Sequence, residues 1–292
     1  MKTIQHNDFK VTKAIKLSEI DTSIDLGEDE KKVEKELKKV RKELGKLQDT
    51  IYAHGKYAIL VCLQGMDTAG KDSLIREVFK DFNVRGVEVY SFKVPTDKEL
   101  GHDYLWRHYI ALPQRGKFGV FNRTHYENVL VTRVHPEYIL GENLPYVKTV
   151  DDVDEAFWEK RFEQIRNFEN HIAENGTLIY KFYLHLSKGE QKNRLLRRLE
   201  KQEKNWKFSA GDLKERKLWD QYQECYEDAI NKTSTEKAPW FVIPADEKPN
   251  ARYLVAKILY DTLRQYNDIK EPELDEKTKA NLHLYKEELE KE

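Results

Sequence analysis

Cysteine is scarce in this sequence, because only Cys62 and Cys225 occur among its 292 residues. So few cysteines indicate neither a disulfide framework nor a cysteine-rich metal site. Scarce, unpaired cysteine is typical of proteins in a reducing compartment. We therefore expect a cytoplasmic protein that folds without disulfides.

Long apolar runs and an excess of charge of one sign are also missing. No stretch approaches the ~20 apolar residues of a membrane span, and residues 1–17 lack the unbroken apolar core of a signal peptide. The 51 Lys and Arg residues nearly cancel the 52 Asp and Glu residues, giving a net charge of −1. We therefore expect neither a membrane nor a nucleic acid as partner.

What is present is an alternation of apolar runs with helical patterns. Strand candidates lie at residues 57–65, 87–94, 117–123, 177–187 and 239–246. Helical patterns lie at residues 71–82, 97–111, 124–133, 152–174, 188–203, 211–232 and 250–266. This alternation predicts an α/β fold, a parallel sheet with helices on both faces. In such sheets ligands bind beyond the carboxyl ends of the strands.

The chain ends differ from this core. Residues 28–54 predict a long charged helix whose narrow apolar stripe would pack on the core or on another subunit. The stripe consists of Val33, Leu37, Val40, Leu44, Leu47 and Ile51. We expect an N-terminal extension (1–54), a core (55–270) with a lid at about 188–235, and a polar helical tail (271–292).

Residues 65–73, GMDTAGKDS, have the outline of a phosphate-binding loop between a strand and a helix. The glycines permit close backbone approach, so that N–H groups and the helix N-terminus can bind an anion. Lys71 adds a positive charge for a transferable phosphoryl group. The residues assigned to phosphate are Gly65, Ala69, Gly70, Lys71 and Ser73.

Two carboxylates in this loop need a separate explanation. Asp67 and Asp72 would repel phosphate unless a cation lies between them, and Mg²⁺ commonly bridges one or two carboxylates to substrate phosphates. We therefore predict both as partners of Mg²⁺, with Mn²⁺ as an alternative. Asp72 could instead orient or deprotonate an acceptor phosphate, or complement the helix dipole.

The third strand candidate ends in Asn122, where ATP-using phosphate-loop enzymes usually carry Asp. Arg123 follows, and Glu127 is either a metal partner or, with Thr124, a capping box. Upstream, Trp106 offers a flat ring for a nucleobase and Arg107 a guanidinium for phosphate. Asn122, Arg123 and Arg133 are assigned to the nucleotide as well, although a surface ion pair would also explain Arg133.

Residues 192–217 hold ten basic and four acidic side chains. Ser209, Ala210, Gly211 and Asp212 break this insert into two helices, as expected of a closing lid. Basic side chains on a lid can neutralise a transferring phosphoryl group and exclude water. Two solvated helices are the alternative interpretation of such a charge run.

Together these motifs resemble the polyphosphate kinase 2 family. The matching stretches cover most of residues 55–265 and are GMDTAGKDS, SFKVPTDKELGHDYLWRHYIALP, FNRTHYENVLVTRVHPEY, FWEKRFEQIRNFE, NWKFSAGDLKER and APWFVIPAD. The resemblance implies a thymidylate-kinase-like fold with a helical lid, and Mg²⁺-dependent phosphoryl transfer between inorganic polyphosphate and nucleotides. The FNRTHYE version resembles the subgroup that phosphorylates both AMP and ADP.

The resemblance also assigns residues. Asp67, Lys71 and Asp72 match loop positions for phosphate, metal and catalysis, while Arg123 and Arg107 match catalytic and nucleotide-site arginines. The positions similar to polyphosphate-facing lid residues are Arg194, Arg197, Arg198 and Lys207. Many members carry Asp at the position of Asn122, and Glu127 could supply the carboxylate that Asn122 lacks.

We therefore predict a reversible polyphosphate:AMP/ADP phosphotransferase that gives ADP and ATP. The charged N-terminal helix and the resemblance both favour a homo-oligomer. An ATP-dependent nucleoside monophosphate kinase on the same scaffold is the alternative. A non-enzymatic module that binds polyanions through the basic lid is a third interpretation.

Overall fold

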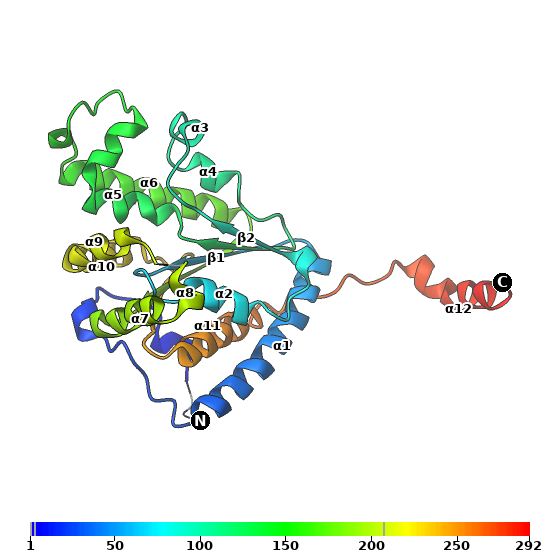
Figure 1. Ribbon diagram of the computed structural model, residues 1–292. Coiled ribbons are helices and arrows are strands. Elements are labelled where there is room, and N and C mark those ends of the chain that lie inside the picture. The colour runs from blue at the N-terminus through cyan, green and yellow to red at the C-terminus, as the bar shows by residue number, and fades with distance from the viewer. Residues whose placement is uncertain (1, 3, 207) are drawn as a thin grey trace.

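A five-stranded, all-parallel sheet organises the chain (Figure 1). The computed structural model describes residue 2, residues 4–206 and residues 208–292. The strands, in the spatial order β2-β3-β1-β4-β5, are β1 (Ala58–Gln64), β2 (Val87–Ser91), β3 (Phe118–Asn122), β4 (Thr177–His185) and β5 (Trp240–Pro244). In the central strand, Val61 is aligned with Val120 on one side and Tyr180 on the other. The predicted α/β fold is confirmed.

One face of the sheet is covered by α1 (Glu30–His54), α2 (Lys71–Val78) and α11 (Lys248–Leu263). Alternate residues of β1, such as Ile59 and Val61, belong to this core, as the period of a strand requires. The apolar stripe of α1 is buried or half-buried in the same core. The stripe therefore packs within the chain, which was one of the two predicted arrangements.

The opposite face is covered mainly by α6 (Glu155–Glu174) and α10 (Trp219–Thr233). Leu60 and Cys62 of β1 point into this layer. It also holds a fully buried ion pair, in which the Lys181 Nζ lies 2.6 Å from Glu169 Oε2. Each charge in the pair has further hydrogen bonds, as buried charges require.

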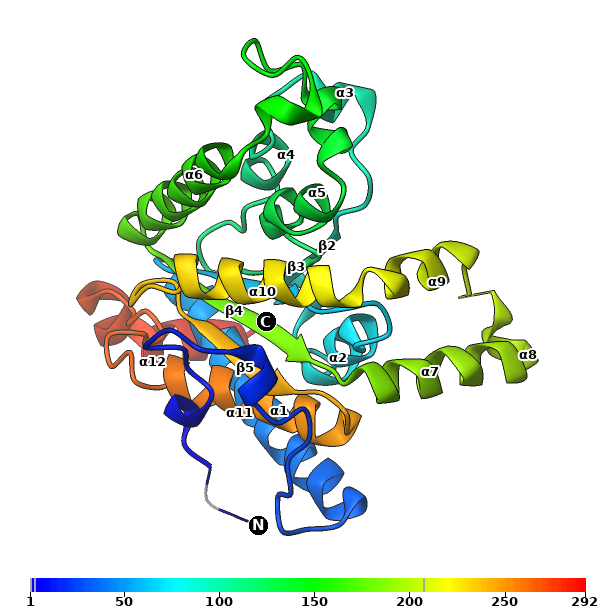
Figure 2. The ribbon, with the colours of Figure 1, turned by 90° about the vertical axis from the view of Figure 1, so that its left-hand side faces the viewer.

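The connection after β4 extends away from the sheet as α7 (Lys188–Glu200), α8 (Gln202–Asn205) and α9 (Ala210–Lys217) (Figure 2). A helical connection was predicted from the basic insert, but it has three helices in place of two. Ala210–Asp212, predicted as part of the break, form the first turn of α9, which Ser209 caps. Helix α7 starts where Ser187 Oγ accepts from the Glu190 N–H, and it ends where Lys201 becomes extended. Lys207 lies outside the described residues.

Four predicted helices are interrupted. Residues 188–203 form α7 and α8, which are separated at Lys201, and residues 211–232 form α9 and α10, which are separated at Leu218. Residues 97–111 form α3 (Asp97–Leu100) and α4 (Trp106–Tyr109), because the Asp103 carboxylate accepts from the Leu105 N–H and competes with a continuous helix. Residues 124–133 form a 3₁₀ segment followed by α5 (Val131–Val134). The 3₁₀ segments are His6–Asp8, Leu17–Glu19, Val84–Gly86, His125–Val129, Pro136–Glu142 and Val150–Asp152.

The last helix, α12 (Glu276–Glu290), projects from the body of the molecule and buries none of its residues (Figure 1). By contrast, the N-terminal extension adds to the same core as the sheet, through Leu26 and α1. In the described part of the chain, no helix has both the length and the apolar composition needed to cross a membrane.

Candidate active site

The loop between β1 and α2 has a backbone that few residue types tolerate. Gly65 has φ 151° and Gly70 has φ 107°, a region that favours glycine. A Cβ on Gly65 would also lie 3.0 Å from the Leu184 carbonyl oxygen. Thr68 has φ 68°, which is strained for a β-branched residue. The loop runs directly into α2 at Lys71, where the first N–H groups of a helix lack helical partners.

The Lys71 ammonium is folded back over this loop. Its Nζ donates to the Gly65 carbonyl oxygen at 2.5 Å and lies 3.4 Å from the Met66 carbonyl oxygen. Burial, together with the nearby Arg123, lowers the pKa of Lys71 to about 8. A bound anion would favour the protonated form again. Lys71 is therefore placed to bind phosphate through its charge.

Arg123 lies between two carboxylates. Its Nη2 lies 2.8 Å from Asp67 Oδ1, and its Nη1 lies 3.4 Å from Glu127 Oε2. Glu127 is the main cause of the raised pKa of Arg123. The Thr124 hydroxyl caps the following segment by accepting from the Tyr126 N–H at 3.1 Å. The Glu127 carboxylate is thus engaged by the arginine, and only the Thr124 half of the predicted capping box is observed.

Asn122 faces Asp72 across the end of the sheet. Its Nδ2 donates to Asp72 Oδ1 at 2.6 Å and to Ser91 Oγ at 3.2 Å. Its Oδ1 is buried and has no protein partner, which is unusual for an amide oxygen. Asp67, Asp72 and this oxygen are the kind of donors that Mg²⁺ prefers. Since no three His, Cys, Asp or Glu side chains of the described residues could hold a metal alone, phosphate and water would complete the shell.

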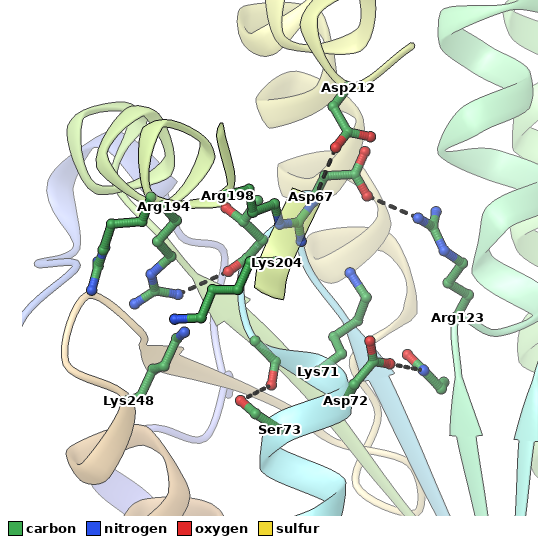
Figure 3. Close-up of a pocket in the computed structure, with 14 residues that line it drawn as sticks. Asp67, Lys71, Asp72, Ser73, Arg123, Arg194, Arg198, Lys204, Asp212 and Lys248 are labelled. Carbon is green, nitrogen blue, oxygen red and sulfur yellow. Dashed lines mark hydrogen bonds and ion pairs between the residues drawn. The ribbon is translucent and has the colours of Figure 1, made fainter. Parts of the chain in front are cut away.

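A cavity of about 400 Å³ lies over the loop and under the lid (Figure 3). Its lining contains seven basic and three acidic side chains. The lining residues are Asp67, Thr68, Gly70, Lys71, Asp72, Ser73, Asn122, Arg123, Arg194, Arg197, Arg198, Lys204, Asp212 and Lys248. Phosphate loop, third strand and lid are therefore brought together, as the sequence predicts. Glu127 is not part of the lining.

The lid arginines differ in their surroundings. Arg197 Nη2 lies 2.7 Å from Glu190 Oε1, and the Arg197 side chain is half exposed. Arg198 Nη1 lies 3.0 Å from Asp212 Oδ2, an ion pair between the two arms of the lid (Figure 3). The Arg194 side chain, in contrast, is only 4% exposed. The three arginines of α7 therefore differ: Arg197 is half exposed, Arg198 pairs with the other arm of the lid, and Arg194 is buried.

Lys248 is the main residue of the cavity that the sequence analysis missed. It is the first residue of α11 and reaches the cavity from beyond β5. Burial and the neighbouring Arg194 and Arg197 lower the pKa of Lys248 to about 8. The available signal was its position just after the fifth strand, at the edge where ligands bind.

The predicted nucleotide residues lie outside this cavity, except for Asn122 and Arg123. Arg107 lines two neighbouring pockets; it donates to the Lys93 carbonyl oxygen at 2.8 Å. Trp106 stacks on His102, with 4.0 Å between the ring centroids. Arg133 lies in an ion pair with Asp228 of α10, 2.7 Å between Nη1 and Oδ2, so the ion-pair alternative describes its present contact.

Comparison with known proteins agrees with this geometry. The model of the polyphosphate kinase 2 family matches residues 27–271. An ADP-polyphosphate phosphotransferase from Rhodopseudomonas palustris is 47% identical over 227 residues, which are 78% of this chain and 78% of that protein. An AMP/ADP-polyphosphate phosphotransferase from Meiothermus ruber is 50% identical over 220 residues, 75% of this chain and 77% of that protein.

The fold has a solved counterpart. The crystal structure of a polyphosphate kinase 2 from Arthrobacter aurescens superposes with a TM-score of 0.87 at 37% identity. The match covers 96% of this chain and 95% of that chain. The similarity therefore extends over the sheet, the lid and the N-terminal extension together, and confirms the family expected from the motifs.

Proposed function

This chain belongs to the polyphosphate kinase 2 family, and from that membership we propose that it transfers phosphoryl groups reversibly between inorganic polyphosphate and AMP or ADP. The observation that carries the proposal is the cavity in which seven basic side chains surround the phosphate loop. A donor made only of phosphate carries a charge at each internal phosphate. Such a polyanion binds through many cations at once, with strong salt dependence.

In the transfer itself, Lys71 and Arg123 stabilise the charge of the terminal phosphoryl group. An oxygen of the acceptor phosphate forms a bond to that phosphorus while the bond to the next phosphate of the chain breaks. Polyphosphate leaves one phosphate shorter. A phosphate monoester has its second pKa near 6, so the attacking oxygen is already ionised at neutral pH. Positioning then supplies most of the rate.

Asp67 and Asp72, with the Asn122 amide oxygen, fit a divalent cation. Mg²⁺ is the proposed ion, and Mn²⁺ would accept the same oxygens. When bound, the ion neutralises charge on the phosphates. We propose that Glu127 acts on this site through Arg123, its ion-pair partner.

The acceptor nucleotide is proposed to lie between the cavity and the pockets beside α4. Arg107 and Arg123 would hold its phosphate, and the Trp106 ring would contact the base. Asn122, at the end of β3, lines the cavity and would lie next to the phosphate to be extended. Arg133 would reach the nucleotide only after its ion pair with Asp228 opens.

Product analysis from AMP, polyphosphate and Mg²⁺ tests this function. ADP and ATP together support transfer to both acceptors, and ADP alone would remove the second acceptor. If the protein converts AMP with ATP but never with polyphosphate, it is the alternative, an ATP-dependent nucleoside monophosphate kinase. The same assay without protein is the control.

Location and assembly complete the proposal. Both cysteines are free thiols in the described structure, the state that a reducing compartment such as the cytoplasm maintains. A homo-oligomer remains a prediction, because the apolar stripe of α1 is covered within the chain. Light scattering of the purified protein measures the mass of the assembly directly.

A further inference from the structure

Two buried side chains of α7 donate hydrogen bonds to backbone carbonyl oxygens of the phosphate loop. Gln191 and Arg194 are one helical turn apart, and they are 2% and 5% exposed. Gln191 Nε2 donates to the Asp67 carbonyl oxygen at 3.1 Å. Arg194 Nη1 donates to the carbonyl oxygens of Thr68 at 2.9 Å and Ala69 at 3.0 Å. Three consecutive carbonyls of the loop are therefore held by the first helix of the lid.

Arg194 has no donor left for a substrate. Its other N–H groups bind Glu190 Oε1 through Nε and the carbonyl oxygens of Ala245 and Asp246 through Nη2, each at 2.8 Å. A guanidinium has five N–H donors, and all five are accounted for by protein acceptors. Figure 3 shows the side chain turned towards the loop backbone at one wall of the cavity.

The part of the loop that is held is also the part that is strained. Thr68 has φ 68°, and strain of this kind persists only where surrounding contacts enforce it. Because a trans peptide points its C=O and N–H in opposite directions, holding the Ala69 carbonyl fixes where the Gly70 N–H points. The contacts from α7 thus set the orientation of loop peptides.

The same contacts connect the loop to the returning arm of the lid. Arg216 of α9 donates to Gln191 Oε1 at 2.7 Å and to the Lys188 carbonyl oxygen at 2.8 Å. The Gln191 amide therefore accepts from one lid helix and donates to the loop. A movement of α9 changes the position of an amide that touches the Asp67 peptide.

We propose that Gln191 and Arg194 are positioning residues, which hold the phosphate loop in its strained form and couple it to the lid, and that Arg194 is not a ligand of polyphosphate. The inference rests on the proposed function, since the loop is assigned to phosphoryl transfer. It differs from the expectation that Arg194 faces polyphosphate, like its neighbour Arg197.

The kinetic test compares Arg194→Lys and Gln191→Leu with the exposed control Lys192→Gln. Lysine keeps the charge of Arg194 but cannot span its acceptors, so kcat should fall by about 10–100-fold with little change in KM for polyphosphate. Gln191→Leu removes no charge and should lower kcat in the same way. The slope of log KM against log salt should stay that of the wild type in both variants.

A side chain that binds phosphate would behave differently. If Arg194 were such a ligand, Arg194→Gln would lower that slope by about one, and Arg194→Lys would retain kcat. Either result overturns the proposal.

Hydrogen exchange gives a readout that does not depend on the reaction. The Ala69 N–H donates to the Met66 carbonyl oxygen at 3.0 Å, so its exchange reports opening of the loop. Exchange should be at least about tenfold faster in both variants, and unchanged in Lys192→Gln. Unchanged loop exchange overturns the proposal even if polyphosphate proves not to be the donor. Should Arg194→Lys not fold, Gln191→Leu alone decides, because it removes only two hydrogen bonds, to the Asp67 carbonyl and from Arg216, and no charge.

Discussion

The Asn122 amide donates to the Asp72 carboxylate, with 2.6 Å between Nδ2 and Oδ1. This contact joins the end of β3 to the start of α2, on the floor of the cavity. An asparagine can make it without a metal, because the amide supplies a proton to the carboxylate. An aspartate at the same position could not. The chain thus joins the end of β3 to the start of α2 before any cation binds.

Asn122→Asp should make the folded protein dependent on a divalent cation. Two facing carboxylates without a donor should cost about 1–3 kcal/mol, so the melting temperature in EDTA should fall by several degrees. Mg²⁺ should restore most of the loss. Thermal melts with and without Mg²⁺ measure both effects. The double swap Asp72→Asn with Asn122→Asp retains one donor and one acceptor, and should melt like the wild type in EDTA. If Asn122→Asp melts at the wild-type temperature in EDTA, this account is wrong.

Lys71→Met should abolish most of the transfer while the fold persists. Loss of a charge that stabilises the transferring group typically lowers the rate by about 10²–10³-fold. Stability at pH 7 should not decrease, since a buried ammonium with a lowered pKa disfavours the folded state. Initial rates and a urea titration check the two statements. Full transfer activity in the variant would contradict the role of Lys71. A polyanion-binding module would instead bind polyphosphate equally well in both proteins and show transfer in neither.

Polyphosphate affinity should weaken as the pH rises through about 8. Lys71 and Lys248 both have a pKa lowered from 10.5 to about 8 by burial. Below pH 8 both are charged in the free protein, and above it they lose their protons. Bound polyanion favours the charged forms, so binding near pH 8–9 should take up protons.

Calorimetry in two buffers with different ionisation enthalpies measures this uptake. Lys248→Arg should reduce it, because arginine stays protonated at every accessible pH. The linkage also has a sign for stability. A lysine whose folded pKa is lowered makes unfolding less favourable as the pH rises from about 8 to about 10.5. Proton release in place of uptake would refute the assignment.

Lys181→Met should destabilise the fold strongly. The substitution leaves the buried Glu169 carboxylate without its ion-pair partner, which typically costs about 3–5 kcal/mol. The double variant Lys181→Met with Glu169→Leu removes both charges and should recover a large part of the loss. Urea titrations of the three proteins measure the free energy of unfolding. If Lys181→Met is as stable as the wild type, the Lys181–Glu169 ion pair is not needed for the stability of the fold.

The sequence predicted the sheet and the centre of the site for physical reasons. Strand periodicity places alternate residues of β1 on two faces, and parallel strands end at one edge. Asp67, Lys71, Asp72, Asn122 and Arg123 therefore share a cavity as expected. Each predicted strand was two or three residues longer than the observed one, because apolar periodicity does not mark where the ladder stops.

Other features depend on contacts that no local pattern records. Lys248 reaches the cavity from the start of α11, and apart from its position after the fifth strand no pattern distinguishes it from other lysines. Arg194 and Arg197 have similar sequence surroundings, yet burial separates them. Similarly, Arg123, the ion-pair partner of Glu127, has a left-handed backbone with φ 59°, which no residue pattern indicates. Only the folded backbone shows which of these charges faces open space.

The two buried thiols can report local unfolding of the elements that contain them. Cys62 lies inside β1 and Cys225 inside α10, both buried, and burial raises the pKa of each thiol. A protonated, covered thiol reacts slowly with alkylating agents. Alkylation of Cys62 therefore times the separation of the central sheet, whereas alkylation of Cys225 times the lifting of α10, the helix that carries it. Quantifying the two labelled peptides by mass spectrometry would rank these events in the unmodified protein.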